Sequence, residues 1–172
     1  MNNLIPVSGD ERVEVENTLY REARLLENEE FREWLKMIHP DVQFKAFNQQ
    51  LRYRKEKRYK LPDKVHSLDE NYQFLEARVK QFETGFQWTA DPPETVRRFL
   101  TNIEVFKASG TDIYKIYLNV FAVRNRRIYE ETTYSYGREE EWVRDDGELK
   151  LIHRIETVDE RFIYGKNLNF FM

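Results

Sequence analysis

The second half of the chain alternates between apolar and polar side chains over four long segments, and this feature constrains the fold more than any other. The segments cover residues 99–108, 113–124, 127–143 and 148–158. In the second segment, apolar side chains occupy every other position: Tyr114, Ile116, Leu118, Val120 and Ala122. A two-residue period is typical of a strand with one buried face. Polar turns are expected between the segments, at residues 109–112, 124–127 and 145–147. The last turn contains Asp-Gly, a strong hairpin signal, so the sequence predicts an antiparallel sheet.

The first half of the chain has a helical period instead. Four apolar residues recur at steps of three and four positions, which indicates one buried face of a helix. These residues are Val15, Leu19, Ala23 and Leu26, with Asp10 as the expected N-cap. A second short helix is expected over residues 29–37, followed by a short strand over residues 41–47.

A third helix is expected to begin at Ser67. The spacing from Ser67 to Glu70 fits a capping box, and Gly85 stands where a helix C-terminus favours glycine. Helices first and strands afterwards are typical of an α+β fold with the helices on one face of the sheet. At 172 residues, the chain fits a single domain, residues 1–172.

Composition excludes several classes of chemistry. The chain has no cysteine, which excludes disulfides, a cysteine nucleophile and thiolate zinc sites. Its six glycines are scattered, so a glycine-rich phosphate loop is absent. A net charge of −3 argues against nucleic-acid binding, and no apolar segment is long enough to cross a membrane.

Residues 52–60 form a basic run that leaves two interpretations open. With Tyr53 and Tyr59 as stacking platforms, the run could bind nucleic acid. A charged hairpin or loop at the sheet edge explains it more simply, because charges on an edge oppose aggregation. We favour the edge. The acidic triplet at residues 139–141 is expected to be solvated or to pair with arginines of neighbouring strands.

Of the three histidines, only His153 suggests a catalytic alternative. It alternates with Leu149, Leu151 and Ile155, which predicts that its side chain points to the core. The simpler interpretation is a structural histidine. The alternative is a general base in an enclosed cavity, with Tyr20 or Asp41 as its partner.

The segment of residues 88–105 combines rigidity with charge. Two prolines precede an arginine pair, and Arg97 and Arg98 should point to opposite faces of a strand. A stiff segment loses little entropy on docking, and arginine suits interface ion pairs. The chain also has an apolar C-terminal segment, residues 167–172. These segments could form a subunit interface that includes Trp88, Asp91, Pro92, Pro93, Arg97, Arg98, Phe170 and Phe171. The alternatives are that both arginines pair within the domain and that the C-terminal segment docks on its own sheet.

Several stretches together resemble a known family. They are residues 20–28 and 31–35, residues 78–105 with their Asp-Pro-Pro and Thr-Val-Arg-Arg motifs, and residues 167–171. In this order and spacing, they are similar to the small (beta) subunit of aromatic-ring-hydroxylating dioxygenases, the Rieske non-haem iron oxygenases. The chain departs from the family pattern at residues 45–48, Glu94 and Val96.

The resemblance implies a cone-shaped, NTF2-like (cystatin-like) fold, with three N-terminal helices on a curved antiparallel sheet. It implies a non-catalytic structural subunit of an NADH- and O2-dependent aromatic ring dioxygenase, in a cytoplasmic complex of three large and three small subunits, with the small subunits associating as a trimer. It also implies that the Rieske 2Fe-2S cluster and the mononuclear iron belong to the large (alpha) subunit. A Rieske centre needs two cysteines and two histidines, and this chain has no cysteine. The alternative is a stand-alone NTF2-like isomerase or dehydratase using a cavity around His153.

Overall fold

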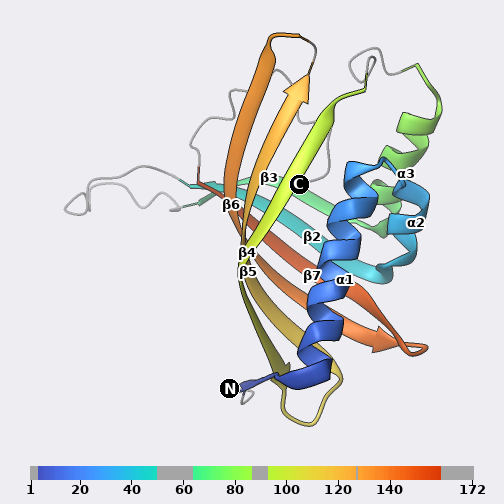
Figure 1. The fold of residues 1–172 in the computed structure, drawn as a ribbon. Helices are drawn as coiled ribbons and strands as arrows, with labels where there is room; N and C mark the ends of the chain where they lie inside the picture. The colour runs from blue at the N-terminus through green and yellow to red at the C-terminus, as the bar shows by residue number, and fades with distance from the viewer. Residues whose placement is uncertain (1–3, 50–63, 87–92, 127, 160–172) are drawn as a thin grey trace, which may run out of the picture.

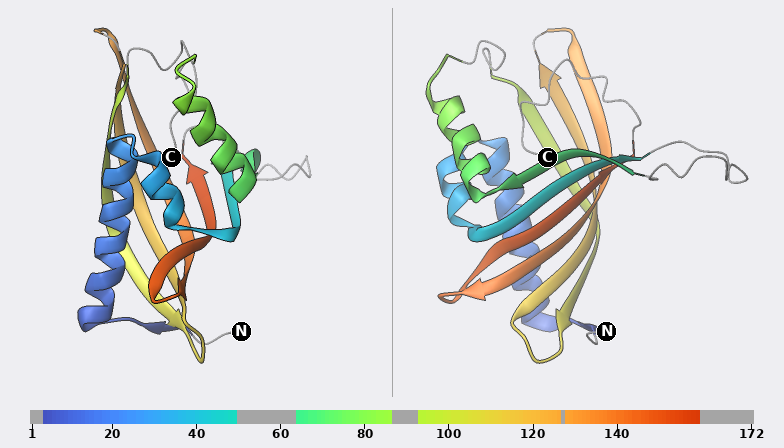
Figure 2. Two further views of the ribbon diagram at one scale, coloured as in Figure 1. Left: turned by 90° about the vertical axis from the view of Figure 1, so that its right-hand side faces the viewer. Right: turned by 180° about the vertical axis from the view of Figure 1, so that it is seen from behind.

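The computed structural model describes residues 4–49, 64–86, 93–126 and 128–159, and it shows a strongly curved sheet with helices on its concave face (Figures 1 and 2). In chain order, the described elements are β1 (Leu4–Pro6), α1 (Gly9–Glu27), α2 (Phe31–Lys36), β2 (Ile38–Gln49), β3 (Lys64–Asn71), α3 (Tyr72–Glu83), β4 (Thr95–Ala108), β5 (Ile113–Arg126), β6 (Glu130–Asp145) and β7 (Glu148–Val158). The order of strands across the sheet is β1-β4-β5-β6-β7-β2-β3. The pair β2–β7 is parallel, and the other described pairs are antiparallel.

The four strands predicted in the second half are confirmed, and β5 is central to the sheet. Its inward side chains are buried at alternate positions, as the two-residue period predicted. β5 runs on through Arg126, which pairs with Glu130, so the turn expected at residues 124–127 lies further along the chain. The turn from β6 to β7 has positive φ angles at Asp146 (50°) and Gly147 (83°). Positive φ at both central residues is the geometry that the Asp-Gly signal predicts for a tight hairpin.

α1 lies along the concave face of the sheet, and its predicted apolar stripe is buried (Figure 1). The helix begins at Gly9 after Ser8, so Asp10 lies in its first turn and is not the N-cap. α2 follows after a short break, and Trp34 and Leu35 are its buried residues. β2 then begins at Ile38, earlier than the predicted strand.

The expected start of the third helix is wrong. Ser67 lies within β3, and its hydroxyl donates to the carbonyl of Ala46 at 3.0 Å. α3 begins at Tyr72, where the side chain of Asn71 accepts a hydrogen bond from the Phe74 amide at 3.1 Å. β3 pairs with β2 up to Asn71, so strand pairing satisfies the backbone that the local capping signal would have placed in a helix.

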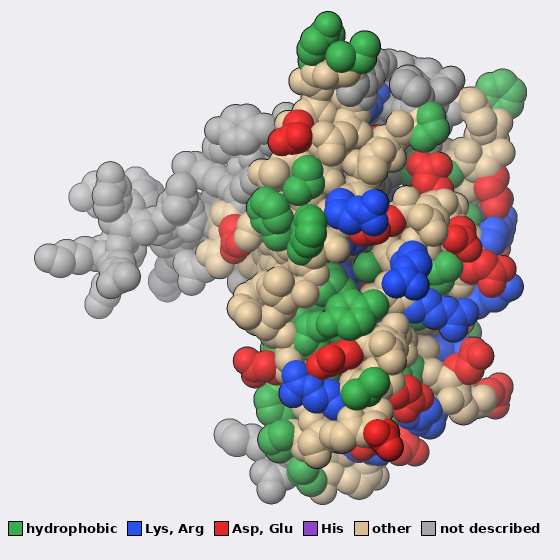
Figure 3. Space-filling model, viewed as in Figure 1, with side chains coloured by type: hydrophobic (Ala, Val, Ile, Leu, Met, Phe, Trp, Pro, Cys, Tyr) green, Lys and Arg blue, Asp and Glu red, His purple; other side chains and the backbone are tan. Residues whose placement is uncertain are grey.

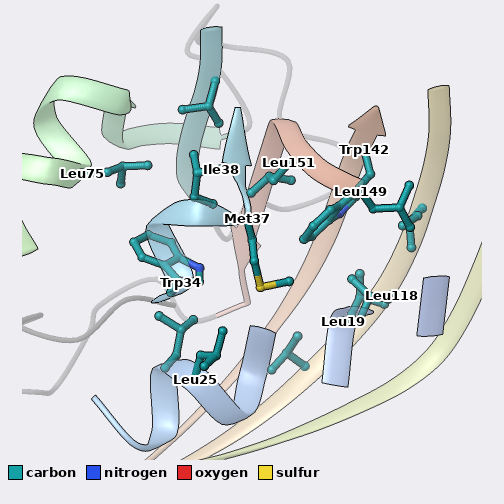
Figure 4. Close-up of a cluster of buried hydrophobic side chains, with 14 of the residues drawn as sticks. Leu19, Leu25, Trp34, Met37, Ile38, Leu75, Leu118, Trp142, Leu149 and Leu151 are labelled. Atoms are coloured by element: carbon teal, nitrogen blue, oxygen red, sulfur yellow. The ribbon is translucent and has the colours of Figure 1, made fainter. Parts of the chain in front are cut away.

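The hydrophobic core fills the space between the helices and the concave face. In Figure 4, Trp34 and Met37 extend from α2 and the residue after it toward leucines of α1 and the sheet. Trp34, Leu19, Leu151 and Trp142 are each at most 1% exposed. A fully buried side chain of this size contributes on the order of 2 kcal/mol or more through the hydrophobic effect. This core fixes α1 and α2 against β5, β6 and β7.

The convex face of the sheet is not covered by any helix in the described part of the chain (Figure 2, right). Phe99 and Phe121 form a cross-strand pair there, with ring centroids 6.4 Å apart, and both are about half exposed. In the space-filling view, side chains of both charges alternate over the helical side of the molecule (Figure 3). No helix among the described residues is both long enough and apolar enough to span a membrane.

Candidate functional site

The start of β4 is fastened to the end of α1 by one carboxylate. Glu27 accepts a hydrogen bond from Arg97 Nη1 through one oxygen and from the Arg98 backbone amide through the other, both at 2.7 Å. The side chain of Glu27 is only 10% exposed, which strengthens charge-assisted hydrogen bonds relative to a fully solvated pair. The arginine-bearing strand therefore has a fixed position on the helix.

The two arginines point to opposite faces, as predicted. The Arg97 side chain is 62% exposed on the convex side, whereas Arg98 is buried on the concave side with Val96. Burial lowers the pKa of Arg98. Pro93 is exposed. Of the other residues predicted for the interface, Trp88, Asp91, Pro92, Phe170 and Phe171 lie outside the described residues, as does the basic run at residues 52–60.

A second ion pair anchors the same end of the sheet. Arg124 Nε donates to Glu94 at 2.7 Å, and both side chains are almost fully buried. Thr95 in β4 lies opposite Asn125 in β5. This register brings Glu94 and Arg124, the residues that precede them, close together on neighbouring strands. Glu94 was noted in the sequence only as a departure from the family pattern. Its partner is 30 residues away along the chain, so local spacing carried no signal of the pair.

Inside the cone, four charged side chains form a closed ring of ion pairs. Glu22 of α1 accepts from Arg138 of β6 and Arg154 of β7, both at 2.7 Å. Glu140 of β6 pairs with the same two arginines, with Arg154 Nε 2.7 Å from its carboxylate. All four side chains are at most 1% exposed. The ring therefore joins α1 to the two central strands β6 and β7.

Two indoles complete the ring. Trp34 Nε1 donates to Glu22 at 3.1 Å, and Trp142 Nε1 donates to Glu140 at 2.6 Å. Burial by itself raises the pKa of Glu22, but Arg154 and Arg138 outweigh burial and lower the pKa to about 2. Glu22 is therefore ionised in the folded protein. The ring can hold four buried charges because each charge has two opposite neighbours.

The sequence contains a signal for this ring in the alternation of β6. Arg138 and Glu140 alternate with Tyr134, Tyr136 and Trp142, so all five share the inward face of β6. For the acidic triplet, pairing with arginines is confirmed at Glu140, whereas Glu141 lies on the convex side near Lys115 at 3.6 Å.

The predicted orientation of His153 is wrong. A register shift occurs between Glu141 and Trp142 of β6, where Trp142 lies opposite Leu151 but Glu141 lies opposite His153. The extra residue in β7 reverses the alternation, because a one-residue slip moves every later side chain to the other face. Arg154 therefore points inward, and His153 is half-buried on the other face.

The residues proposed for the catalytic alternative do not form a site. Tyr20 and Asp41 are exposed. Two open hollows of about 610 and 630 Å³ occur in the described part of the chain, one beside the start of α1 and one on the convex face above Gly137, and neither is lined by His153. Within the same residues, no group of three or more histidine or acidic side chains is arranged to hold a metal ion.

Comparisons with known proteins agree with this architecture. A family model for the ring hydroxylating beta subunit matches residues 21–164. The small oxygenase component of a naphthalene 1,2-dioxygenase system of Pseudomonas aeruginosa is 33% identical over 169 residues, which are 96% of this chain and 88% of that protein. The small oxygenase component of a 2,4-dinitrotoluene dioxygenase system of Burkholderia sp. (strain RASC) is 31% identical over 167 residues, which are 95% of this chain and 86% of that protein.

A solved structure of naphthalene 1,2-dioxygenase with indole bound has a chain that superimposes with a TM-score of 0.85 at 30% identity. The match covers 96% of this chain and 88% of that chain. The expected cone-shaped, NTF2-like α+β fold is thereby confirmed, with the helices on a large curved sheet that remains open. The chain belongs to the beta-subunit family of ring-hydroxylating dioxygenases.

Proposed function

We propose that this chain is the non-catalytic structural subunit of the terminal oxygenase component of an aromatic-ring-hydroxylating dioxygenase. The single observation that carries the proposal is the similarity over almost the whole chain to small oxygenase components of such systems. The work of the chain in this proposal is to hold large catalytic subunits in an assembly that degrades aromatic compounds.

The interior of the cone supports a structural role. An enzyme of this shape would need an open pocket lined by a few converging polar groups. Here the ring of Glu22, Arg138, Glu140 and Arg154 occupies the concave face, and its charges neutralise one another. A group that is already bound on both sides to opposite charges is poorly suited to exchange protons with a substrate.

The iron cofactors expected of such a system do not fit this chain. A Rieske 2Fe-2S cluster needs two cysteine ligands, and the sequence has none. A mononuclear iron site uses two histidines and one carboxylate, and the described residues do not bring such a set together. We therefore assign both iron centres to the large (alpha) subunit, along with the substrate pocket.

For the assembly, we propose three large and three small subunits, with the small subunits associating as a trimer. The proposed contact surface includes Trp88, Asp91, Pro92, Pro93, Arg97, Arg98, Phe170 and Phe171. Among these, Arg97 is the described residue best placed for contact, because its guanidinium is exposed and held by Glu27. A side chain held in place loses less entropy on binding than a free one.

The test is to express the chain with its large subunit and to measure native mass, visible spectrum, iron and acid-labile sulfide on the same sample. We expect a large, reddish-brown assembly containing both subunits, and a colourless preparation from the chain alone. A colourless small oligomer from cells that demonstrably contain soluble large subunit would overturn the proposal.

A further inference from the structure

A third buried carboxylate lies beside the closed ring of charges. Glu156 of β7 is 0% exposed, and its neighbours across the sheet are Arg138 on β6 and Ala46 on β2. It points to the same face as Arg154, two residues earlier. Nothing in the proposed structural role accounts for an additional acidic group at this position.

Glu156 is not a member of the ring. Two carboxylates, Glu22 and Glu140, and two guanidiniums, Arg138 and Arg154, already balance one another. Among the described residues, neither carboxylate oxygen of Glu156 accepts a hydrogen bond, and no cation lies within ion-pair distance of it. An ionised carboxylate in such a place would cost several kcal/mol more than a neutral one, because nothing replaces its lost hydration.

We propose that Glu156 is held as a neutral, protonated carboxylic acid in the folded chain, so that folding takes up a proton in the interior of the cone. A nearby phenol fits this assignment. Tyr136 on β6 is also fully buried, and its hydroxyl has no hydrogen-bond partner within the described part of the chain. Two neutral groups that can each donate and accept a hydrogen bond are a less costly pair to bury than a phenol and a carboxylate ion.

The charges around Glu156 are arranged so that they largely cancel. Burial has the largest effect and raises the pKa of Glu156 to about 7, while Arg154 and Arg138 lower it and Glu140 and Glu22 raise it. Tyr136 on β6 interacts electrostatically both with Glu156 and with the buried Arg98 of β4. The β2 neighbours of Glu156, Phe44 and Ala46, do not titrate.

The sign of the pH effect follows from this arrangement. In the unfolded chain, Glu156 titrates near the usual glutamate value of about 4.3. Because the folded-state pKa is higher, the folded chain holds the proton over a range in which the unfolded chain has lost it. The contribution of Glu156 to the free energy of unfolding is therefore greatest below about pH 4.3. It declines as the pH rises to about 7 and does not change further above that pH.

The experiment compares urea unfolding of the full-length wild-type chain and the variants Glu156→Gln and Glu139→Gln from pH 5 to pH 8. Gln resembles the protonated acid, so we expect Glu156→Gln to match the wild type at pH 5. From about pH 5 to 7, the unfolding constant of the wild type should rise relative to that of the variant by close to tenfold per pH unit. Glu139→Gln is the control, because Glu139 is exposed on the same strand pair and should leave the wild-type profile unchanged.

Parallel pH profiles for the wild type and Glu156→Gln would overturn the proposal. If Glu156→Gln does not fold, Glu156→Met offers a neutral side chain of similar size for the same comparison. Infrared spectra of the wild-type chain in heavy water give an independent measurement. We expect the carbonyl stretch of a protonated carboxyl at pH 6 and its loss by pH 8.5, and absence of that band at pH 6 would also overturn the proposal.

Discussion

The concave and convex faces of the sheet are built by the same strands, but charged side chains are buried and paired on one face and exposed on the other. On the concave face, Glu22 and Glu140 share two arginines and are sealed from water under α1 and α2. On the convex face, Glu104 and Glu139 are among the residues that line a hollow above Gly137. The exposed pair Phe99 and Phe121 lies nearby on β4 and β5. The four charges of the buried ring are paired, whereas Glu104 and Glu139 on the convex face are exposed to water.

This difference separates the part of the molecule that maintains the fold from the part left available for contact. A buried ionic ring tolerates no missing member, because each lost charge leaves its partner unpaired in a medium of low polarity. Exposed pairs contribute little to stability because water screens them. Changes on the concave face should therefore act on folding, and changes on the convex face should act on assembly.

The largest effect is expected from Glu22→Gln. The substitution leaves two buried arginines with one carboxylate, and we expect a loss of about 3–5 kcal/mol in unfolding free energy at pH 7. Urea unfolding monitored by tryptophan fluorescence measures this loss. The matched control is Glu16→Gln on the same helix, whose exposed pair with Arg12 should contribute only about 0.5 kcal/mol. Equal losses for both variants would contradict the contrast between the faces.

Glu22 also gives a pH prediction with the opposite sign to that of Glu156. Its folded-state pKa is lowered to about 2, so its contribution is complete above its unfolded value of about 4.3 and is lost as the pH falls toward 2. Acid unfolding of the wild type should therefore steepen below about pH 4.3. Glu22→Gln should show a shallower acid transition in the same titration, followed by far-ultraviolet circular dichroism.

A smaller loss is expected from Trp34→Phe. The ring of the indole is replaced, but its hydrogen bond to Glu22 is lost and one donor to a buried carboxylate disappears. We expect a loss of about 2 kcal/mol, within the range of hydrogen bonds to charged groups. Phe31→Leu, at the half-buried start of the same short helix, is the control for packing. If Trp34→Phe lost less unfolding free energy than Phe31→Leu, the indole would contribute by packing alone and the predicted role of its hydrogen bond would be wrong.

The smallest effect on stability is expected from Arg97→Ala, and here the comparison between the faces is sharpest. Arg97 is the exposed partner of its pair with Glu27, and Glu27 keeps the Arg98 amide as a second donor, so the loss to the fold should be about 1 kcal/mol or less. The same substitution should weaken association with the large subunit in size-exclusion chromatography of the co-expressed complex. Arg12→Ala, which also removes an exposed arginine but lies on α1, should assemble normally. Normal assembly of Arg97→Ala would remove this residue from the proposed interface.

Local patterns predicted the type of most elements because their physical cause is local. The alternation in residues 113–124 required a strand with one buried face, and the stripe from Val15 to Leu26 required an amphipathic helix. Ser67 shows the limit of this reasoning. Its capping signal was genuine as a sequence pattern, but pairing between β2 and β3 offered the same backbone a larger set of hydrogen bonds.

The candidate site was less predictable because its contacts join distant parts of the chain. Glu22 meets Arg138 across 116 residues, and Arg97 meets Glu27 across 70. For Arg97 and Arg98, strand alternation predicted that the side chains point to opposite faces. It did not predict that Glu27 accepts hydrogen bonds from the Arg97 guanidinium and the Arg98 backbone amide. For His153, alternation alone gave the wrong face, because a single extra residue in β7 depends on how β6 and β7 pair.

The sequence alone determined that the second half of this chain is an antiparallel run of four long strands, that the first half contains amphipathic helices, and that the chain lacks the cysteines of a Rieske centre. Those conclusions rest on side-chain periodicity and composition, which act residue by residue. Only the tertiary structure decided which inward charges balance one another and which remain alone, as Glu156 does beside the ring. The reason is physical: the free energy of a buried charge depends on its neighbours in space, and strand register sets those neighbours.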